Sequence, residues 1–134
     1  MRILVTMSGD LFHYGDVNLL KNIKNDYSNC KIILGLHNDE VITSYKRKPV
    51  LTFFERKSVI ESCKYVDELF DCPLNITKEL LKEQNIDLIV HGHSELEHEQ
   101  YRFLWEGNEN MFKRYNYTKG ISTTEIIERI KNSI

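Results

Sequence analysis

Residues 2–24, RILVTMSGDLFHYGDVNLLKNIK, contain the pattern that decides the fold. The apolar run at 3–5 predicts a short buried strand, and the apolar residues of 17–23 recur at helical spacing. The turn between them carries Gly9 and Gly15. A strand, a glycine-bearing turn and a helix start together present unpaired backbone N–H groups and the positive end of a helix dipole, which suits an anion such as phosphate.

His13 lies in this turn, two residues before Gly15. Its imidazole could reach a phosphate oxygen bound at the start of the helix. Taken alone, however, the turn favours an ordinary strand-to-helix connection in which His13 is a solvated loop residue. Other segments of the chain must therefore decide between these two interpretations.

Further apolar runs alternate with helical patterns along the chain. Strands are predicted at 31–36, 65–70, 86–91 and 111–117, and helices at 52–63, 77–84 and 124–134. Apolar strands separated by helices are typical of a parallel sheet covered on both faces. We therefore predict an α/β fold, a Rossmann-like doubly wound parallel sheet of about five strands, with one domain over residues 1–134.

Composition limits the partners of the chain. With 134 residues, 41% apolar and 28% charged residues, the chain is typical of a soluble globular domain. A net charge of −2 predicts no nucleic-acid or membrane partner, so any phosphate site must be built from particular cations and backbone groups. Three cysteines without a CxxC pair predict reduced thiols, a cytoplasmic location and no structural zinc.

Three motifs occur in order, HYGD at 13–16, SYKRKP at 44–49 followed by ER at 55–56, and YTKGISTT at 117–124. Together they resemble the cytidylyltransferase family of HxGH nucleotidyltransferases, which includes the glycerol-3-phosphate and ethanolamine-phosphate enzymes. The sequences of the second and third motifs most resemble those of cytidylyltransferase domains associated with phosphonate biosynthesis. The resemblance runs from residue 1 to about residue 129.

The resemblance implies a reaction and its partners. A phosphate or phosphonate oxygen of a small acceptor attacks the α-phosphorus of CTP and pyrophosphate leaves, giving a precursor of a phospholipid, a phosphonate or a cell-surface polymer. Such a transfer depends on positioning and charge neutralisation. Mg²⁺ is expected with CTP, and a homodimer is expected from the family. The identity of the acceptor is not decided by the resemblance, because many relatives have the sequence HGDD at the positions where residues 91–94 of this chain are HGHS.

The same resemblance assigns site residues. The catalytic residues are His13 at the α/β-phosphates, Lys46 at the developing charge, and Asp16. Nucleotide contacts are expected from Met7, Ser8, Asp10, His13, Gly15, His91, Gly92, Tyr117, Thr118, Gly120, Ile121, Ser122 and Thr123. Phosphate or acceptor contacts are expected from Lys46, Lys48 and Arg56. No side chain is assigned as a metal ligand, and Asp10 is expected to organise the first turn.

Asp16 departs from the family, which has a second histidine at this position. A fixed carboxylate repels a triphosphate unless a cation or a proton intervenes. Three explanations are open. The chain is an active enzyme in which Asp16 binds Mg²⁺ or in which the charge of Asp16 is offset by Lys46. Alternatively, it is a nucleotide-binding protein with impaired turnover, or an introduced variant of an active parent. The enzyme ranks first because Lys46 and the GISTT segment are intact.

Four smaller expectations concern local structure. His37 is expected to be a loop residue, and Val59 to point partly inward with its helix. Ser122 is expected to cap the last helix, with Glu125 at capping-box spacing. Residues 95–110 are expected to form either an irregular helix over the edge of the site or a subunit contact.

Overall fold

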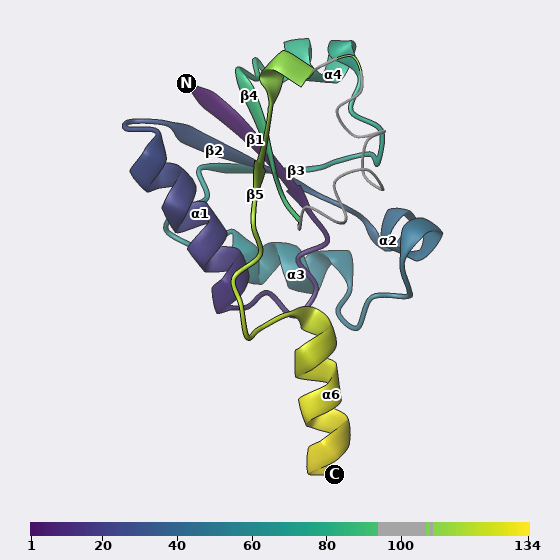
Figure 1. Ribbon diagram of the computed structural model, residues 1–134. Coiled ribbons are helices and arrows are strands. Elements are labelled where there is room, and N and C mark those ends of the chain that lie inside the picture. The colour runs from purple at the N-terminus through teal and green to yellow at the C-terminus, as the bar shows by residue number, and fades with distance from the viewer. Residues whose placement is uncertain (94–106, 108) are drawn as a thin grey trace.

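The structure, a computed structural model, describes residues 1–93, 107 and 109–134. Five parallel strands form one sheet in the order β3-β2-β1-β4-β5. The strands are β1 (Arg2–Met7), β2 (Lys31–Leu36), β3 (Glu68–Asp71), β4 (Leu88–Gly92) and β5 (Phe112–Tyr115). The helices are α1 (Tyr14–Asp26), α2 (Asp39–Tyr45), α3 (Phe53–Ile60), α4 (Lys78–Glu83), α6 (Thr123–Ser133) and the 3₁₀ turn η2 (Glu109–Met111). Figure 1 shows this arrangement, which confirms the predicted doubly wound sheet.

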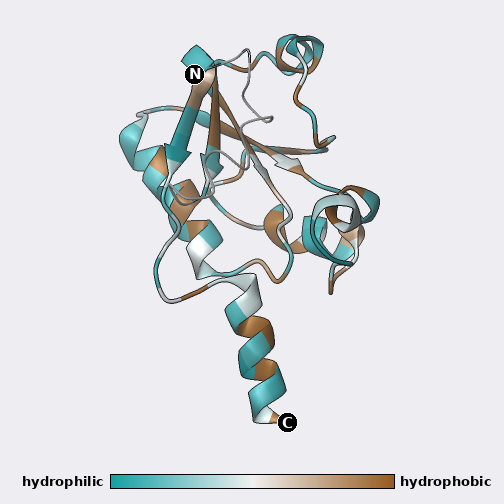
Figure 2. Cartoon of the chain, turned by 45° about the vertical axis from the view of Figure 1, so that its right-hand side comes forward, coloured by the Kyte–Doolittle hydropathy of each residue, from teal (hydrophilic) through white to brown (hydrophobic). Residues whose placement is uncertain are grey.

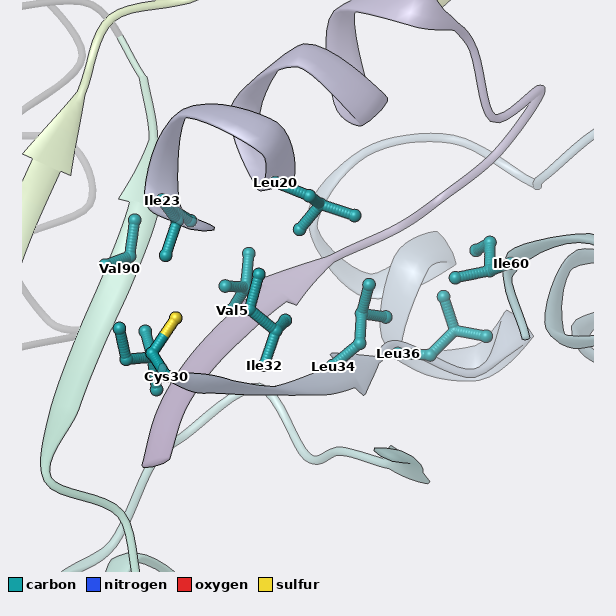
Figure 3. Close-up of a cluster of buried hydrophobic side chains, with 10 residues drawn as sticks. Val5, Leu20, Ile23, Cys30, Ile32, Leu34, Leu36, Ile60 and Val90 are labelled. Carbon is teal, nitrogen blue, oxygen red and sulfur yellow. The ribbon is translucent and has the colours of Figure 1, made fainter. Parts of the chain in front are cut away.

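The core lies on both faces of the sheet because the central positions of β1 and β2 are apolar. On one face, the side chains of Val5 and Ile32 pack under Leu20 and Ile23 of α1, as Figure 3 shows. On the other face, a second cluster contains Leu4, Ile33, Leu81, Ile86 and Ile89, which brings in α4. Neighbouring strand residues point to opposite faces, so a continuous apolar run is what a sheet buried on both sides requires.

Two local predictions need correction. Val59 does not point inward: it is 54% exposed, whereas Ile60 is fully buried against the sheet, and neighbouring helix positions differ by about 100° in direction. β3 starts at Glu68 rather than at residue 65. The carboxylate of Asp67 accepts the amide of Ile32 at 2.8 Å and the ammonium of Lys24 at 2.6 Å, which anchors the chain just before the strand.

The last helix has the predicted cap, although it starts at Thr123 rather than at residue 124. Ser122 is its N-cap and its hydroxyl oxygen accepts the amide of Glu125 at 3.1 Å. From this end α6 extends away from the sheet and carries the C-terminus (Figure 1), and apolar residues gather along one side of it (Figure 2). In the described part of the chain, no helix has the length and apolar character needed to cross a membrane.

The strand order places the site. Going along the sheet, the direction of chain progression reverses between β1 and β4. In open α/β sheets, ligands bind beyond the carboxyl ends of the strands at such a reversal. Most of the 95–110 segment lies outside the described residues, so the two interpretations of that segment are not decided.

Candidate functional site

A cavity of about 620 Å³ lies at the carboxyl edge of the sheet, with walls contributed from the ends of all five strands. It is lined by Thr6, Met7, Ser8, Gly9, Asp10, His13, Gly15, Asp16, Leu19, His37, Tyr45, Lys46, Leu74, His91, Gly92, Asn116, Tyr117, Thr118, Ile121, Ser122, Thr123 and Thr124. The first motif, the lysine of the second motif and most of the third motif therefore share one cavity. Lys48, Arg56 and Gly120 are the predicted site residues that do not line it.

His13 caps α1. Its Nδ1 accepts the amide of Gly15 at 3.0 Å, and its backbone carbonyl accepts the amide of Val17 at 3.1 Å. Because Nδ1 accepts a hydrogen bond, the neutral imidazole carries its proton on Nε2. The side chain is 12% exposed at the cavity wall. His13 thus offers a fixed N–H donor beside the positive end of α1, which is the chemistry that a phosphate oxygen requires.

Asp16 completes the same cap. Its carboxylate accepts the amide of His13 at 3.1 Å and lies 3.5 Å from the Nε2 of His13. Burial raises the pKa of Asp16, while His13 and the ammonium of Lys46 act in the opposite direction. The residue that departs from the family is therefore engaged with the turn itself, in a capping box whose N-cap is a histidine. Sequence analysis missed this role because capping boxes usually begin with Ser or Thr.

The start of α1 and the start of α6 meet directly. A β-carbon placed on Gly15 would lie 2.8 Å from Cε1 of His13 and 3.1 Å from Cγ2 of Ile121, so only glycine lets the two turns approach this closely. The side-chain amide of Asn18 donates to the hydroxyl of Thr118 at 2.9 Å. Two helix N-termini consequently border one cavity.

Asp10 fixes the basic segment 46–51 against this turn, which agrees with its expected organising role. Its carboxylate accepts the amides of Val50 and Leu51 at 2.9 and 3.0 Å and the guanidinium of Arg47 at 3.1 Å. Burial alone would raise the pKa of Asp10, but these three donors together hold it below its ordinary value. The segment therefore has a rigid base, from which Lys46 reaches the cavity.

Lys46 follows α2 directly and its backbone amide bonds the carbonyl of Ile42 at 2.9 Å. Its side chain lines the cavity, and its charge bears on the pKa values of Asp16, His37 and His91. One ammonium acts on groups from α1, β2 and β4 together. The ammonium of a lysine is a compact charge on a long side chain, and in this place it can follow a phosphate as its charge develops.

Arg56, which was predicted to contact phosphate or acceptor, does not line the cavity. Its side chain is fully buried, and Nη1 donates to the carbonyl oxygens of Ser8 and His37 at 2.6 Å each. Nε donates to the carbonyl of Leu51 at 3.1 Å and Nη2 to the carboxylate of Asp39 at 2.6 Å. Arg56 therefore holds together the connections that follow β1 and β2 and the segment that precedes α3.

Two other predicted contacts also lie outside the cavity. Lys48 is exposed, and it is Arg47 that bonds Asp10. Gly120 has a φ of 85° and forms the turn before α6, where its carbonyl accepts from Arg129 at 3.2 Å. Gly120 therefore allows the backbone to turn at the point where α6 begins.

His37 lies in the connection between β2 and α2, as expected, but it is only 4% exposed and lines the cavity. Its Nδ1 lies 2.7 Å from the hydroxyl of Tyr45. Burial, with the charges of Arg56 and Lys46, lowers the pKa of His37 to about 4. The sequence carries no local signal for this position, because burial here results from the packing of α2 and α3 on the end of β2.

His91 and His93 form a pair at the end of β4, with their Nδ1 atoms 2.7 Å apart. Burial, then the neighbouring His93, His37 and Lys46, lower the pKa of His91 to about 3, so its imidazole is neutral at pH 7. Within the described ranges, no group of three or more His, Cys, Asp or Glu side chains is arranged to hold a metal ion.

Parallel strands in this order, two helix N-termini at one cavity, an imidazole donor and a lysine are typical of Rossmann-like domains that bind nucleotides. Residues 8–129 match the family described as cytidylyltransferase-like. The match covers most of the chain, so the chain belongs to the cytidylyltransferase-like family, as the three motifs predicted.

Individual relatives agree with this assignment. The chain is 34% identical over 128 residues to choline-phosphate cytidylyltransferase 2 of Arabidopsis thaliana, which covers 90% of this chain and 41% of that protein. It is 31% identical over 133 residues to ethanolamine-phosphate cytidylyltransferase of Dictyostelium discoideum, covering 97% of this chain and 36% of that protein. The chain thus spans less than half the length of these curated relatives.

Among solved structures, the lipopolysaccharide core biosynthesis protein from Thermoplasma volcanium GSS1 is similar, with a TM-score of 0.69 and 18% identity. The alignment covers 90% of this chain and 98% of that chain. At this identity the similarity concerns the fold.

Proposed function

We propose that this domain transfers CMP from CTP to a small acceptor that carries a phosphate or phosphonate group. An oxygen of that group attacks the α-phosphorus, the bond from the α-phosphorus to the bridging oxygen breaks, and pyrophosphate leaves with the electron pair. The observation that carries the proposal is the single cavity shared by His13, Lys46 and the start of α6. The named relatives, which are cytidylyltransferases for choline phosphate and ethanolamine phosphate, support the reaction type.

The geometry suggests how each group acts. The Nε2–H of His13 would bind an oxygen between the α- and β-phosphates, and Lys46 would neutralise the charge that develops there. The first amides of α6 have no intrahelical acceptor and would hold the end of the triphosphate. The hydroxyl of Thr123 is committed to the carbonyl of Asp10 at 2.9 Å, so its share of the cradle falls to its backbone amide.

Mg²⁺ would enter as part of the substrate, bound to CTP. The carboxylates that line the described part of the cavity, Asp10 and Asp16, both accept hydrogen bonds within their own turns. Phosphate oxygens and water would therefore supply most of its ligands, which is a common mode of Mg²⁺ binding. The ion supplies neutralisation of the triphosphate charge.

Three finer expectations remain proposals of the same kind. The proposal of a phosphonate acceptor is based on the sequences of the second and third motifs. The proposal of a cytoplasmic location is based on the three cysteines, all of which are free thiols. A homodimer rests on the family resemblance, and sedimentation equilibrium at several concentrations tests it.

The test of the proposed function is acceptor-dependent pyrophosphate release from CTP, measured for the chain as given and for Asp16→His. The panel contains glycerol 3-phosphate, phosphoethanolamine, phosphocholine and 2-hydroxyethylphosphonate. Release by the unchanged chain supports the enzyme. If the chain binds CTP but only Asp16→His turns over, the domain is a nucleotide-binding protein with impaired catalysis. If neither protein binds any nucleotide, the proposed function is wrong.

A further inference from the structure

The carboxylate of Asp16 lies beside the N–H group that a phosphate needs. Its Oδ2 accepts the backbone amide of His13 at 3.1 Å and lies 3.5 Å from Nε2 of the same residue. Both side chains line the cavity, and Nε2 carries the ring proton because Nδ1 accepts the amide of Gly15. A phosphate oxygen at hydrogen-bond distance from Nε2 therefore comes to lie next to Oδ2 of Asp16.

An ionised Asp16 and a bound triphosphate are two anions in one confined space. Like charges in such close contact strongly raise the pKa of the more basic group, and the carboxylate is more basic than the strongly acidic α- and β-phosphates. Burial already raises the pKa of Asp16 in the free protein, against the opposing effects of His13 and Lys46. A bound phosphate also attracts the ammonium of Lys46, and so removes part of the charge that keeps Asp16 ionised.

The ring of His13 is not available for this proton while α1 keeps its cap. A second ring proton would place an N–H of Nδ1 against the N–H of Gly15, and the cap would break. The ring is also held sterically, since a β-carbon on Gly15 would lie 2.8 Å from its Cε1. The carboxyl group of Asp16 has no such conflict, because one oxygen continues to accept the amide of His13 while the other carries the proton.

Three other titratable groups of the cavity start far from a charge change near neutral pH. Asp10 is bonded to the guanidinium of Arg47 and to two backbone amides, which hold its pKa below the ordinary value. His37 and His91, at the ends of β2 and β4, have pKa values of about 4 and about 3, so both are neutral above pH 6. A neighbouring phosphate raises the pKa of these two histidines as well, but from a much lower starting value.

Further groups complete the charge balance at this edge of the sheet. The buried guanidinium of Arg56 is paired with the carboxylate of Asp39 at 2.6 Å, so a partner from α2 balances its charge. Tyr117 before α6 and Tyr45 at the end of α2 contribute hydroxyl groups that are uncharged near neutral pH. Among the described lining residues, Asp16 is therefore the group best placed to take up a proton when a triphosphate arrives.

We propose that Asp16 takes up one proton from the solvent when CTP binds, and that its carboxyl group then donates a hydrogen bond to a phosphate oxygen beside His13. The proton returns to the solvent when the nucleotide leaves, so the overall reaction is unchanged. Asp16 thereby supplies a donor at the position where the family has a second histidine. The inference rests on the proposed function and extends it by linking nucleotide binding to pH through one group.

Calorimetric titration with CTP and Mg²⁺ in buffers of different ionisation enthalpy counts the protons that are taken up. The measurement is made at pH 6.5 and 7.5 for the unchanged chain, Asp16→Asn and the control Asp26→Asn. Asp16→Asn keeps an acceptor for the amide of His13 and supplies a permanent donor, whereas Asp26→Asn removes the same charge from the exposed far end of the same helix. Protonation of CTP itself is common to all three proteins and cancels in the comparison.

We expect the unchanged chain and Asp26→Asn to take up at least about half a proton more than Asp16→Asn at pH 6.5. By the same linkage, the affinity of the unchanged chain for CTP, relative to that of Asp16→Asn, should fall by up to about tenfold for each pH unit above this value. Asp16→Asn should therefore bind CTP on the order of tenfold more tightly than the unchanged chain at pH 8.5.

An infrared difference spectrum of the unchanged chain with and without CTP requires no variant to fold, and it should show the band of a protonated carboxyl group. Equal proton uptake in the unchanged chain and folded Asp16→Asn, or absence of that band, overturns the inference while the proposed function stands. CTP binding that requires both Asp16 and Mg²⁺ would make the carboxylate a metal ligand, which also overturns the inference. Absence of CTP binding in all three proteins overturns the proposed function instead.

Discussion

The hydroxyl of Thr123 donates a hydrogen bond to the carbonyl oxygen of Asp10 at 2.9 Å and so joins residues that are 113 positions apart in the chain. Asp10 lies in the turn after β1, and Thr123 is the first residue of α6. This bond, together with the contact between Asn18 and Thr118, sets the start of α6 beside the start of α1. The site therefore depends on tertiary contacts as much as on its motifs.

Thr123→Val should loosen this junction. The substitution keeps the shape and removes the donor, so we expect the free energy of unfolding to fall by about 0.5–1.5 kcal/mol, and CTP to bind more weakly because α6 no longer has a fixed start. Urea unfolding and calorimetric titration with CTP measure the two effects. Ser133→Ala at the far end of α6 is the control, and equal losses in both variants would contradict a special role for Thr123.

Lys46→Ala should reduce kcat by on the order of a hundred- to a thousandfold, because one donor to the developing charge is lost. Lys46 is exposed to solvent, so the thermal midpoint should hardly change. Lys48→Ala removes the same charge from an exposed position outside the cavity and should retain nearly full activity. A comparable loss in both variants would show that only the total charge of the segment matters.

Gly15→Ala should disturb the nucleotide side of the cavity. The added β-carbon would lie 2.8 Å from the ring of His13, and the resulting overpacking costs about 1–3 kcal/mol of stability. We expect at least a tenfold weaker Kd for CTP, since the ring must move away. Tyr14→Ala, at a 58% exposed neighbour outside the cavity, serves as the control. Native affinity in Gly15→Ala would refute the close approach of the two turns.

The stability of the fold should depend on pH through His37. Its pKa is about 4 in the folded protein, whereas the ordinary value of a histidine, which applies to the unfolded chain, is 6.5. Between these values the unfolded chain binds the proton and the folded chain does not, so the free energy of unfolding falls as the pH drops from 6.5 towards 4. This shift corresponds to about 3 kcal/mol at most. The free energy of unfolding, measured with urea at several pH values, should depend less on pH between 6.5 and 4 in His37→Gln. If its pH dependence were the same as that of the unchanged chain, the dependence would come from other groups such as His91.

Sequence patterns were sufficient to predict the architecture of the sheet and its helices. Apolar runs such as 31–36 predict buried parallel strands because a two-sided sheet leaves few other places for them, and the capping residue Ser122 marks the start of α6 through purely local chemistry. The three motifs also contain half of the residues that line the cavity. These features depend on residues close together in the chain.

The contacts that sequence analysis missed are long-range. Arg56 and His37 are 19 positions apart, and the burial of both follows from how α3 and α2 pack on the ends of β1 and β2. Sequence analysis assigned both Lys46 and Lys48 to the site, and the fold shows that Lys46 lines the cavity, that Arg47 bonds Asp10 and that Lys48 is exposed to solvent. Asp16 similarly acquires its role from the backbone of His13.

The most direct test is a crystal structure of the chain with CTP and Mg²⁺. The account predicts the triphosphate between His13 and the first turn of α6, with a phosphate oxygen within hydrogen-bond distance of Nε2 of His13 and the ammonium of Lys46 over the α-phosphate. A nucleotide bound elsewhere on the chain, or bound in the cavity with its triphosphate directed away from both His13 and α6, would contradict it.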